Sequence, residues 1–278
     1  MDWYVILAII LGALLLLSLA LWLFLIAPRA RKKAIQPFLR PYAHRGLWGG
    51  DIPENSLAAF DRAAAKGFAI ELDVQLSADG VVMVFHDYSL NRVCGEEGKV
   101  RERTAAELAA CRLSGTEQHV PTLREVLDTV GGRVPLLIEL KGESSDTDLV
   151  PTTLQVLKGY EGLWCMESFN PLLLRAVKKQ APHVVRGLLS TDLIKEKRKG
   201  SKLLNFALSK LLLTCLCRPA FHAWDQKYPR RTALRTGIRL FGAGSMVYTV
   251  RDPEQYEAFI KKGTYPIFEG FLPKESAK

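Results

Sequence analysis

Short apolar runs alternate along most of this chain with longer stretches in which apolar residues recur every three or four positions. The first pattern predicts buried strands and the second predicts amphipathic helices. Strands are expected at 69–75, 81–85, 135–140, 163–167, 184–189, 220–224 and 246–250, and helices between them, including 56–66, 122–130 and 253–262. Strands that alternate with helices are typical of a parallel sheet.

The part of the chain that follows the first 40 residues is long enough for one large domain. A (β/α)8 TIM barrel needs roughly 250 residues, and the 48% apolar content of the 278-residue chain is sufficient for a core. A doubly wound open sheet is the alternative, but the sequence holds no Gly-x-Gly-x-x-Gly turn to support it. We therefore predict an α/β fold in which residues 41–278 form a TIM barrel.

The segment 3–27 is apolar and carries no charged residue. At about 1.5 Å per residue, a helix of this length crosses a hydrocarbon core of roughly 30 Å. A cleaved signal peptide is the alternative, but it would need positive charge before the apolar run and a small-x-small site after it. Asp2 is the one charged side chain before the run, and 26–29 reads Ile-Ala-Pro-Arg. We therefore predict one uncleaved transmembrane helix, in the segment 1–28.

Basic residues cluster directly after this helix, in the segment 29–40, which contains Arg29, Arg31, Lys32, Lys33 and Arg40. The positive-inside rule places this segment and the residues after it in the cytoplasm. The five cysteines are scattered and lack the spacing of a zinc site, which agrees with free thiols in a reducing compartment. The prediction is a single-pass membrane protein with a basic linker at 29–40 and a cytoplasmic barrel domain.

The net charge of +9 favours an anionic partner. The basic residues border apolar segments, because 29–40 follows the membrane helix and 195–202 precedes the apolar run 203–217. This arrangement favours a membrane lipid surface, so we expect no nucleic-acid partner. The run 203–217 is too short to span a bilayer. Two interpretations stay open for it: an interfacial helix beside the barrel mouth, which would deliver lipid-derived substrates such as lysophospholipids, or a helix packed on the barrel wall.

Three carboxylates lie on strands whose other residues are mostly apolar. Glu71 and Asp73 are two positions apart, so on a strand their side chains point the same way, and Glu139 lies near the end of the strand at 135–140. Acids on core strands are costly unless they are paired or bind a metal, which disfavours three exposed strand-end acids. Carboxylate oxygens suit a hard cation such as Mg2+ or Ca2+. The sequence therefore predicts a divalent metal site formed by these three acids.

Two histidines stand at predicted strand ends. His44 follows the apolar pair 42–43, and His86 ends the run 81–85. Because an imidazole titrates near neutral pH, one histidine can take a proton from a nucleophile while the other gives one to a leaving group. We predict that they are the catalytic acid and base. Asp87 either orients His86 or begins a turn, and both interpretations stay open.

Arg45 and Lys141 bring positive charge to the same strand ends. Arginine offers a planar fork to phosphate oxygens, and lysine offers a point charge. The alternative is a pair of salt bridges to the acids, and the two roles can coexist. We predict that both side chains contact a phosphate.

Five ordered segments carry a family resemblance: His44-Arg45-Gly46, Pro53-Glu54-Asn55-Ser56, Glu71-Leu72-Asp73-Val74-Gln75, His86-Asp87 and Glu139-Leu140-Lys141. Together they resemble the glycerophosphodiester phosphodiesterases over residues 41 to about 250, with weaker echoes at 168–169 and 248–250. The resemblance implies a (β/α)8 barrel, a divalent metal, and hydrolysis of glycerophosphodiesters to an alcohol and glycerol 3-phosphate.

The resemblance also implies roles for individual residues. His44 and His86 become the catalytic pair, the three acids the metal ligands, and Arg45 and Lys141 the phosphate contacts. It further places Glu54 near the metal or the glycerol hydroxyls. Tyr248, which stands where the family often has tryptophan, becomes an aromatic wall against the glycerol. The family's usual Gly-Ile-Ile-Thr-Asp-like last strand is replaced here by the sequence at 265–270, so the course of the eighth strand stays open.

Two other functions remain as alternatives. One is a catalytically inactive barrel that acts as a membrane-bound lipid-binding or regulatory protein, which would require a broken site. The other is a phospholipase of related barrel type that forms a cyclic phosphate and stops there.

Overall fold

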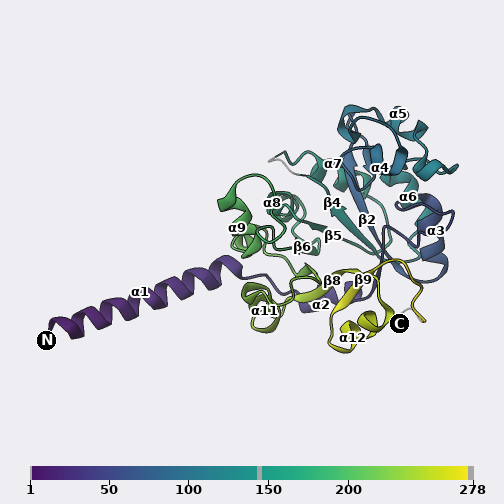
Figure 1. The fold of residues 1–278 in the computed structure, drawn as a ribbon. Coiled ribbons are helices and arrows are strands. Elements are labelled where there is room, and N and C mark those ends of the chain that lie inside the picture. The colour runs from purple at the N-terminus through teal and green to yellow at the C-terminus, as the bar shows by residue number, and fades with distance from the viewer. Residues whose placement is uncertain (1, 143–145, 275–278) are drawn as a thin grey trace.

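Figure 1 shows the chain as a computed structural model, which describes residues 2–142 and 146–274. A long helix, α1 (Trp3–Ile26), projects from a domain built around a closed sheet. Within the described ranges, α1 is the one helix that is long and apolar enough to cross a membrane, by length and composition. Ile26 is its one buried residue. An apolar helix that packs so little against protein agrees with the predicted anchor.

Eight parallel strands form the closed sheet. In sequence order they are β1 (Tyr42–His44), β2 (Ala69–Leu76), β4 (Leu136–Leu140), β5 (Trp164–Ser168), β6 (Arg186–Ser190), β7 (Phe221–Asp225), β8 (Gly244–Val250) and β9 (Tyr265–Phe268). Each strand pairs with the next, and β9 pairs with β1, which closes the sheet into a barrel. The predicted TIM barrel is confirmed, and the doubly wound alternative is wrong. The eighth strand, left open by the sequence, is β9.

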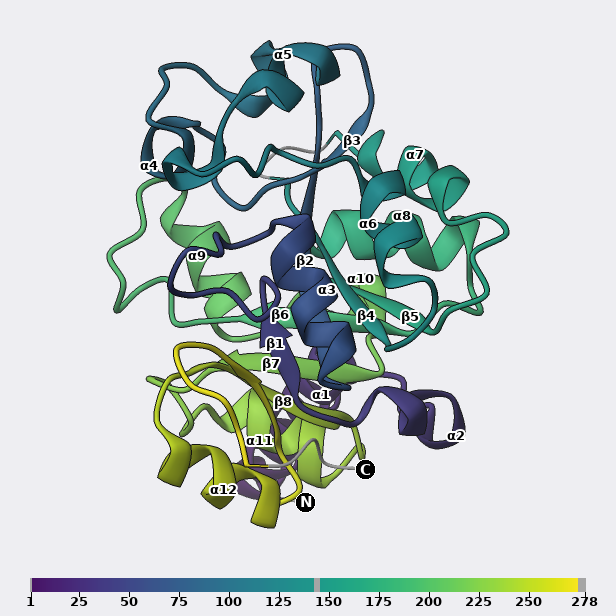
Figure 2. The same cartoon turned by 90° about the vertical axis from the view of Figure 1, so that its right-hand side faces the viewer.

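Helices cover the outside of the barrel, as Figures 1 and 2 show. They are α3 (Leu57–Ala65), α6 (Leu123–Val130), α7 (Leu149–Val156), α8 (Pro171–Gln180), α10 (Thr214–Cys217), α11 (Thr232–Arg239) and α12 (Pro253–Lys261). Polar caps set where they begin: the Ser56 hydroxyl accepts a hydrogen bond from the backbone N–H of Ala59, and Thr122 and Glu125 form a capping box at the start of α6.

The strand expected at 81–85 does not belong to the barrel. It forms β3 (Val82–Val84), which pairs antiparallel with the second half of β2, while β4 takes the parallel position beside β2. The chain then forms an inserted subdomain, residues 85–121, with α4 (Asn91–Cys94), η2 (Val100–Glu102), α5 (Ala105–Ala110) and η3 (Leu113–Gly115). Its buried residues form a small core of their own, and it sits above the barrel in Figure 2.

The predicted linker packs against the barrel. Every strand contributes to an apolar layer in the interior, and β7 contributes two residues: Tyr42, Ala69, Leu137, Cys165, Leu189, Phe221, Ala223, Met246 and Ile267. Ile35 of α2 (Lys32–Ile35) and Phe38 of η1 (Gln36–Phe38) join this cluster. A side chain added at Gly244, the first residue of β8, would meet Ile35. The segment 29–40 therefore closes the amino-terminal end of the barrel, although the division into domains remains a prediction.

The apolar run 203–217 forms two helices instead of one. α9 (Lys202–Ser209) and α10 are separated by Leu211, whose backbone φ is +58°. Cys217 of α10 is buried, and α10 packs on α8, as the wall-packed interpretation requires. α9 instead exposes apolar side chains, with Leu203 78% exposed and Phe206 44% exposed. The two interpretations of this run therefore apply to different halves of it.

The closure of the barrel depends on packing behind β9, which gives a prediction of stability. Phe268 is fully buried, and its ring lies 5.3 Å from that of Phe68 and 5.5 Å from that of Tyr256. Phe268→Ala should lower the free energy of unfolding by about 3–5 kcal/mol because it removes this packing and leaves a cavity. Denaturant titration in detergent would measure the free energy of unfolding of the variant and of the unmodified chain. Phe206→Ala, at an exposed position, should change it by less than about 0.5 kcal/mol; equal effects would contradict the packing argument.

Candidate active site

The three carboxylates predicted as metal ligands meet inside the barrel. Because side chains alternate along a strand, Glu71 and Asp73 share the interior face of β2 with Ala69, and Glu139 shares that of β4 with Leu137. Asp73 and Glu139 are also register partners. One oxygen from each acid lies within 4.8 Å of the others, and the three residues are 2%, 0% and 8% exposed. The cluster therefore lies directly above the apolar layer.

Burial and repulsion perturb all three acids. Burial raises the pKa of Glu71 well above its ordinary value, and the charges of Asp73 and Glu139 raise it further. Burial likewise raises the pKa of Glu139 to about 7. Burial would also raise the pKa of Asp73, but nearby cations, Lys141 foremost, hold it well below its ordinary value. Burial and mutual repulsion thus favour the protonated forms of Glu71 and Glu139, and a close cation would favour ionisation of all three acids.

The donor atoms of the cluster fit a divalent cation. Asp73 Oδ1 is buried and accepts no hydrogen bond from any residue that the structure describes, although the ammonium of Lys141 lies 3.4 Å from it. A buried carboxylate oxygen without a hydrogen bond is costly, and a hard cation bound by carboxylate oxygens would satisfy it. Glu71, Asp73 and Glu139 would hold that cation.

Two cations stand beside the cluster. Lys141 Nζ lies 3.0 Å from Glu139 Oε1 and 3.4 Å from Asp73 Oδ1. A guanidinium nitrogen of Arg45 donates to Glu54 Oε1 at 2.7 Å, and Arg45 Nε lies 3.6 Å from Asp73 Oδ2. The salt bridges given as the alternative are therefore present, and contact with a phosphate remains a prediction for both side chains.

A left-handed turn carries His44 and Arg45 over the acids. The backbone φ is +60° at Arg45 and +83° at Gly46, and a Cβ at Gly46 would lie 2.8 Å from the Cβ of Ala59. Only glycine fits this close approach, so the turn requires it. The turn directs the backbone N–H of Arg45 to Glu71 Oε2, at 2.9 Å.

Each predicted catalytic histidine is held at Nδ1 by a carboxylate. His44 pairs through Nδ1 with Glu269, and its Nε2 lies 4.0 Å from Glu71 Oε2. His86 pairs through Nδ1 with Asp87 Oδ1 at 2.6 Å. Burial lowers the pKa of both histidines. The contact with His86 supports the interpretation that Asp87 orients the ring.

Glu54 joins the site to the inserted subdomain. Arg92 of α4 donates to both carboxylate oxygens of Glu54, at 2.9 and 2.6 Å, and to Asp87 Oδ2 at 2.6 Å. These hydrogen bonds, together with that from Arg45, lower the pKa of Glu54 against the effect of burial. Glu54 lies beside the acidic cluster but is already shared between two arginines.

Tyr248 lies on β8, where burial raises the pKa of its hydroxyl most and the charge of nearby Glu139 raises that pKa further. Its hydroxyl donates to the backbone oxygen of Ser190 at 3.0 Å, and its ring stands edge-on to Phe169 at 5.9 Å between centroids. The two aromatic rings come from the end of β5, which pairs with the strand of Glu139, and from β8. The aromatic wall remains a prediction, and Phe169 would extend it.

Sequence reasoning missed three residues of the site. Glu269 follows the apolar strand β9, and Glu167 lies near the end of the apolar strand β5. The same signal identified Glu71 and Glu139, so it could also have identified these two acids. Glu167 is 1% exposed, lies in register with Glu139, and its pKa is raised well above the ordinary value by burial. Arg92 had no such signal, because it comes from the inserted subdomain.

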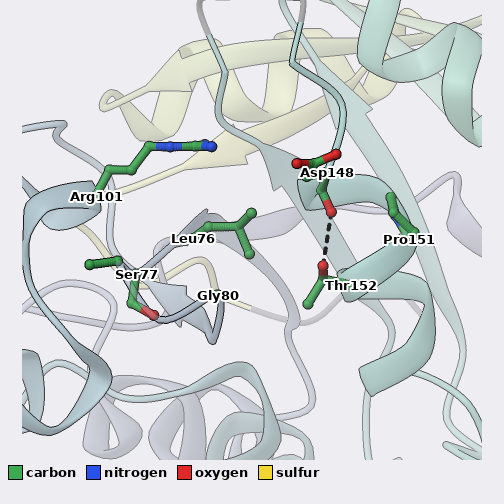
Figure 3. Close-up of a pocket in the computed structure, with 8 residues that line it drawn as sticks. Leu76, Ser77, Gly80, Arg101, Asp148, Pro151 and Thr152 are labelled. Atoms are coloured by element: carbon green, nitrogen blue, oxygen red, sulfur yellow. Dashed lines mark hydrogen bonds between the residues drawn. The ribbon is translucent and has the colours of Figure 1, made fainter.

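A separate hollow of about 430 Å3 lies at the outer side of β2, between η2 and α7. Figure 3 shows Arg101 on one side of it and Asp148, Pro151 and Thr152 on the other. None of the predicted site residues lines this hollow. We therefore assign it no part in the chemistry.

Known proteins share this fold. A putative glycerophosphoryl diester phosphodiesterase from Silicibacter pomeroyi superposes with a TM-score of 0.68 and 25% identity, over 84% of this chain and 93% of that one. An Oleispira antarctica phosphodiesterase, solved with the product sn-glycerol-3-phosphate, also has a TM-score of 0.68, with 24% identity over 83% of this chain and 92% of that one. The second likeness supports the fold alone.

Similarity in sequence extends to the site. A glycerophosphodiester phosphodiesterase from Caldanaerobacter subterraneus is 38% identical over 160 residues, which is 53% of this chain and 65% of that enzyme. The uncharacterized protein YqiK of Bacillus subtilis is 32% identical over 85% of this chain and 96% of its own length. Residues 44–271 match the model of the glycerophosphoryl diester phosphodiesterase family. The resemblance carried by the five segments is thereby confirmed, and the chain belongs to that family.

Proposed function

We propose that this chain hydrolyses glycerophosphodiesters to an alcohol and glycerol 3-phosphate and requires a divalent cation. The observation that carries the proposal is the buried cluster of Glu71, Asp73 and Glu139, flanked by two histidines that are each oriented by a carboxylate. The family supports the class of substrate. An inactive barrel is disfavoured because every side chain that the chemistry needs is present.

The chain's own groups would divide the reaction between them. Arg45 and Lys141 lie close enough to the cluster to bind phosphate oxygens while they remain near their acids. One imidazole takes the proton of the nucleophile, and the other protonates the leaving alcohol oxygen. If the nucleophile is water, glycerol 3-phosphate forms directly; if it is the glycerol hydroxyl, a cyclic phosphate forms first and water must then open it. Because Nδ1 of each ring is held by a carboxylate, Nε2 is the nitrogen that exchanges protons. A bound Mg2+ or Ca2+ would polarise the phosphate and offset its charge.

We also propose that α1 anchors the enzyme and that the barrel faces the cytoplasm. The exposed apolar surface of α1 and the basic segment 29–40 after it support this orientation. α9 lies on the side of the domain from which α1 projects (Figure 1). Its exposed side chains Leu203 and Phe206 would enter the same membrane surface. Lysophospholipids held in that surface are therefore proposed as substrates.

The catalytic pair gives a direct test. His44→Gln and His86→Gln should each lower the release of glycerol 3-phosphate from glycerophosphocholine by about 100- to 10,000-fold, because each removes a proton-transfer group. His119→Gln is the matched control, since His119 pairs with Glu125 near the start of α6, and it should leave activity unchanged. Full activity in either site variant would refute the role given to that histidine. A cyclic phosphate as the only product would instead favour the phospholipase alternative.

Removal of metal tests the acidic cluster. Treatment with a chelator should abolish hydrolysis of glycerophosphocholine, and added Mg2+ or Ca2+ should restore it, because the cation would polarise the phosphate. Glu71→Gln should resist restoration. Activity that persists after exhaustive chelation would contradict the metal requirement.

The proposed role of α9 can be tested by comparing a substrate held in a membrane with a soluble substrate. The double change Leu203→Ser and Phe206→Ser should lower hydrolysis of lysophosphatidylcholine in vesicles by about tenfold or more, because it removes apolar area that would enter the lipid. Hydrolysis of glycerophosphocholine should not change. An equal effect on both substrates, or none on either, would rule out α9 as the substrate-delivering contact.

A further inference from the structure

A group of cations lies where α1 joins the barrel, and its members are held by backbone oxygens. After α1 ends, the backbone N–H of Arg29 donates to the oxygen of Pro219 at 2.9 Å. The guanidinium of Arg31 donates to the oxygens of Pro182 and His183, at 2.8 and 3.1 Å. These contacts fix the segment against the loops that precede β6 and β7.

Arg186 is the buried member of this group. It is the first residue of β6, is 4% exposed, and shares the outward face of that strand with Leu188. One of its terminal nitrogens donates to the oxygen of Val184 at 2.8 Å, but its Nε has no hydrogen-bond partner among the described residues. A buried guanidinium with an unsatisfied donor is costly unless an anion approaches it.

The charged residues around Arg186 are cations. Burial lowers its pKa, the Cys217 thiol opposes this, and the nearby charges of Arg31 and Arg29 lower the pKa further. Lys178 of α8, whose ammonium donates to the backbone oxygen of Leu216 at 3.2 Å, and Arg218 complete the group. We call the five residues the junction cations: Arg29, Arg31, Lys178, Arg186 and Arg218. Within residues 2–142 and 146–274, no acid lies within salt-bridge distance of any of them. Arg45 and Lys141 of the active site, by contrast, are each paired with acids.

The junction cations also contact the last turn of α1. Arg218 donates to the backbone oxygens of Phe24 and Ala27, at 3.0 and 2.7 Å, and its guanidinium lies over the ring of Phe24. The residues 29–34 line an open hollow of about 500 Å3 beside this contact. The group therefore lies where α1 leaves the domain, at the carboxyl-terminal end of the helix (Figure 1). We call this end the foot of α1.

We propose that the junction cations bind the phosphate of an anionic phospholipid in the membrane that α1 enters. Guanidinium groups match phosphate oxygens through paired hydrogen bonds, and the unsatisfied Nε of Arg186 supplies a donor. A lipid is favoured over a free phosphate because the lipid headgroups would surround the foot of α1, within reach of Arg29. The proposal rests on the membrane insertion of α1 and is independent of the hydrolysis reaction.

The test uses the full chain in detergent micelles that contain phosphatidylglycerol or phosphatidylcholine, with bound lipid counted by native mass spectrometry. The chain should retain phosphatidylglycerol about tenfold more than phosphatidylcholine, and Arg29→Gln and Arg186→Gln should each lower that retention about fivefold. Lys66→Gln, after α3 on the opposite side of the domain, is the matched control and should retain lipid like the unmodified chain. Hydrolysis of glycerophosphocholine should be equal in all four proteins, so failure here is distinct from failure of the enzyme assignment.

Three results would overturn the proposal. They are equal retention of the two lipids, unchanged retention in Arg29→Gln, and displacement of phosphatidylglycerol by millimolar inorganic phosphate, which would assign the site to a free anion. Arg29 is exposed, so its variant gives a result even if Arg186→Gln does not fold.

Discussion

Repulsion among three buried carboxylates is the constraint around which the carboxyl end of this barrel is arranged. Glu71, Asp73 and Glu139 converge where the barrel interior changes from apolar to acidic. Each nearby donor offsets part of their negative charge. Lys141 lies between two of the acids, and the Asn55 amide donates to Asp73 Oδ2 at 2.9 Å. Asp73 Oδ1 accepts no hydrogen bond from the described residues, which supports the proposed cation site, and the proposed position of the substrate phosphate follows from the same charges.

Much of this arrangement could be predicted because strand geometry has a strict period of two. That period alone places Glu71 and Asp73 on one face of β2, and the apolar residues around them show that the face is buried. The same rule, applied to the end of β9, would have found Glu269. Helix caps were equally readable, since Ser56 and Thr122 begin α3 and α6.

The features that could not be predicted depend on contacts between distant segments. Arg92 reaches Glu54 only because the inserted subdomain folds over the barrel, and nothing in the local pattern of 85–121 indicates that approach. The antiparallel course of β3 was also hidden, because an apolar run does not reveal its direction. The break at Leu211 was hidden for the same reason. The run 203–217 is mostly apolar in both halves, and packing against α8 is what distinguishes α10 from α9.

Ile35 and Phe38, which pack into the amino-terminal end of the barrel, restrict how the domain can move relative to α1. A flexible tether would let the domain tumble freely above a bilayer, so that its mouth would sample every orientation. Here the connection is part of the core, and Arg218 holds the foot of α1. With α1 in the proposed membrane, the helix and the barrel would therefore rotate as one body. The barrel mouth would keep a fixed tilt relative to the membrane surface. Such an enzyme would encounter substrate by lateral diffusion in two dimensions, with its angle of approach already set.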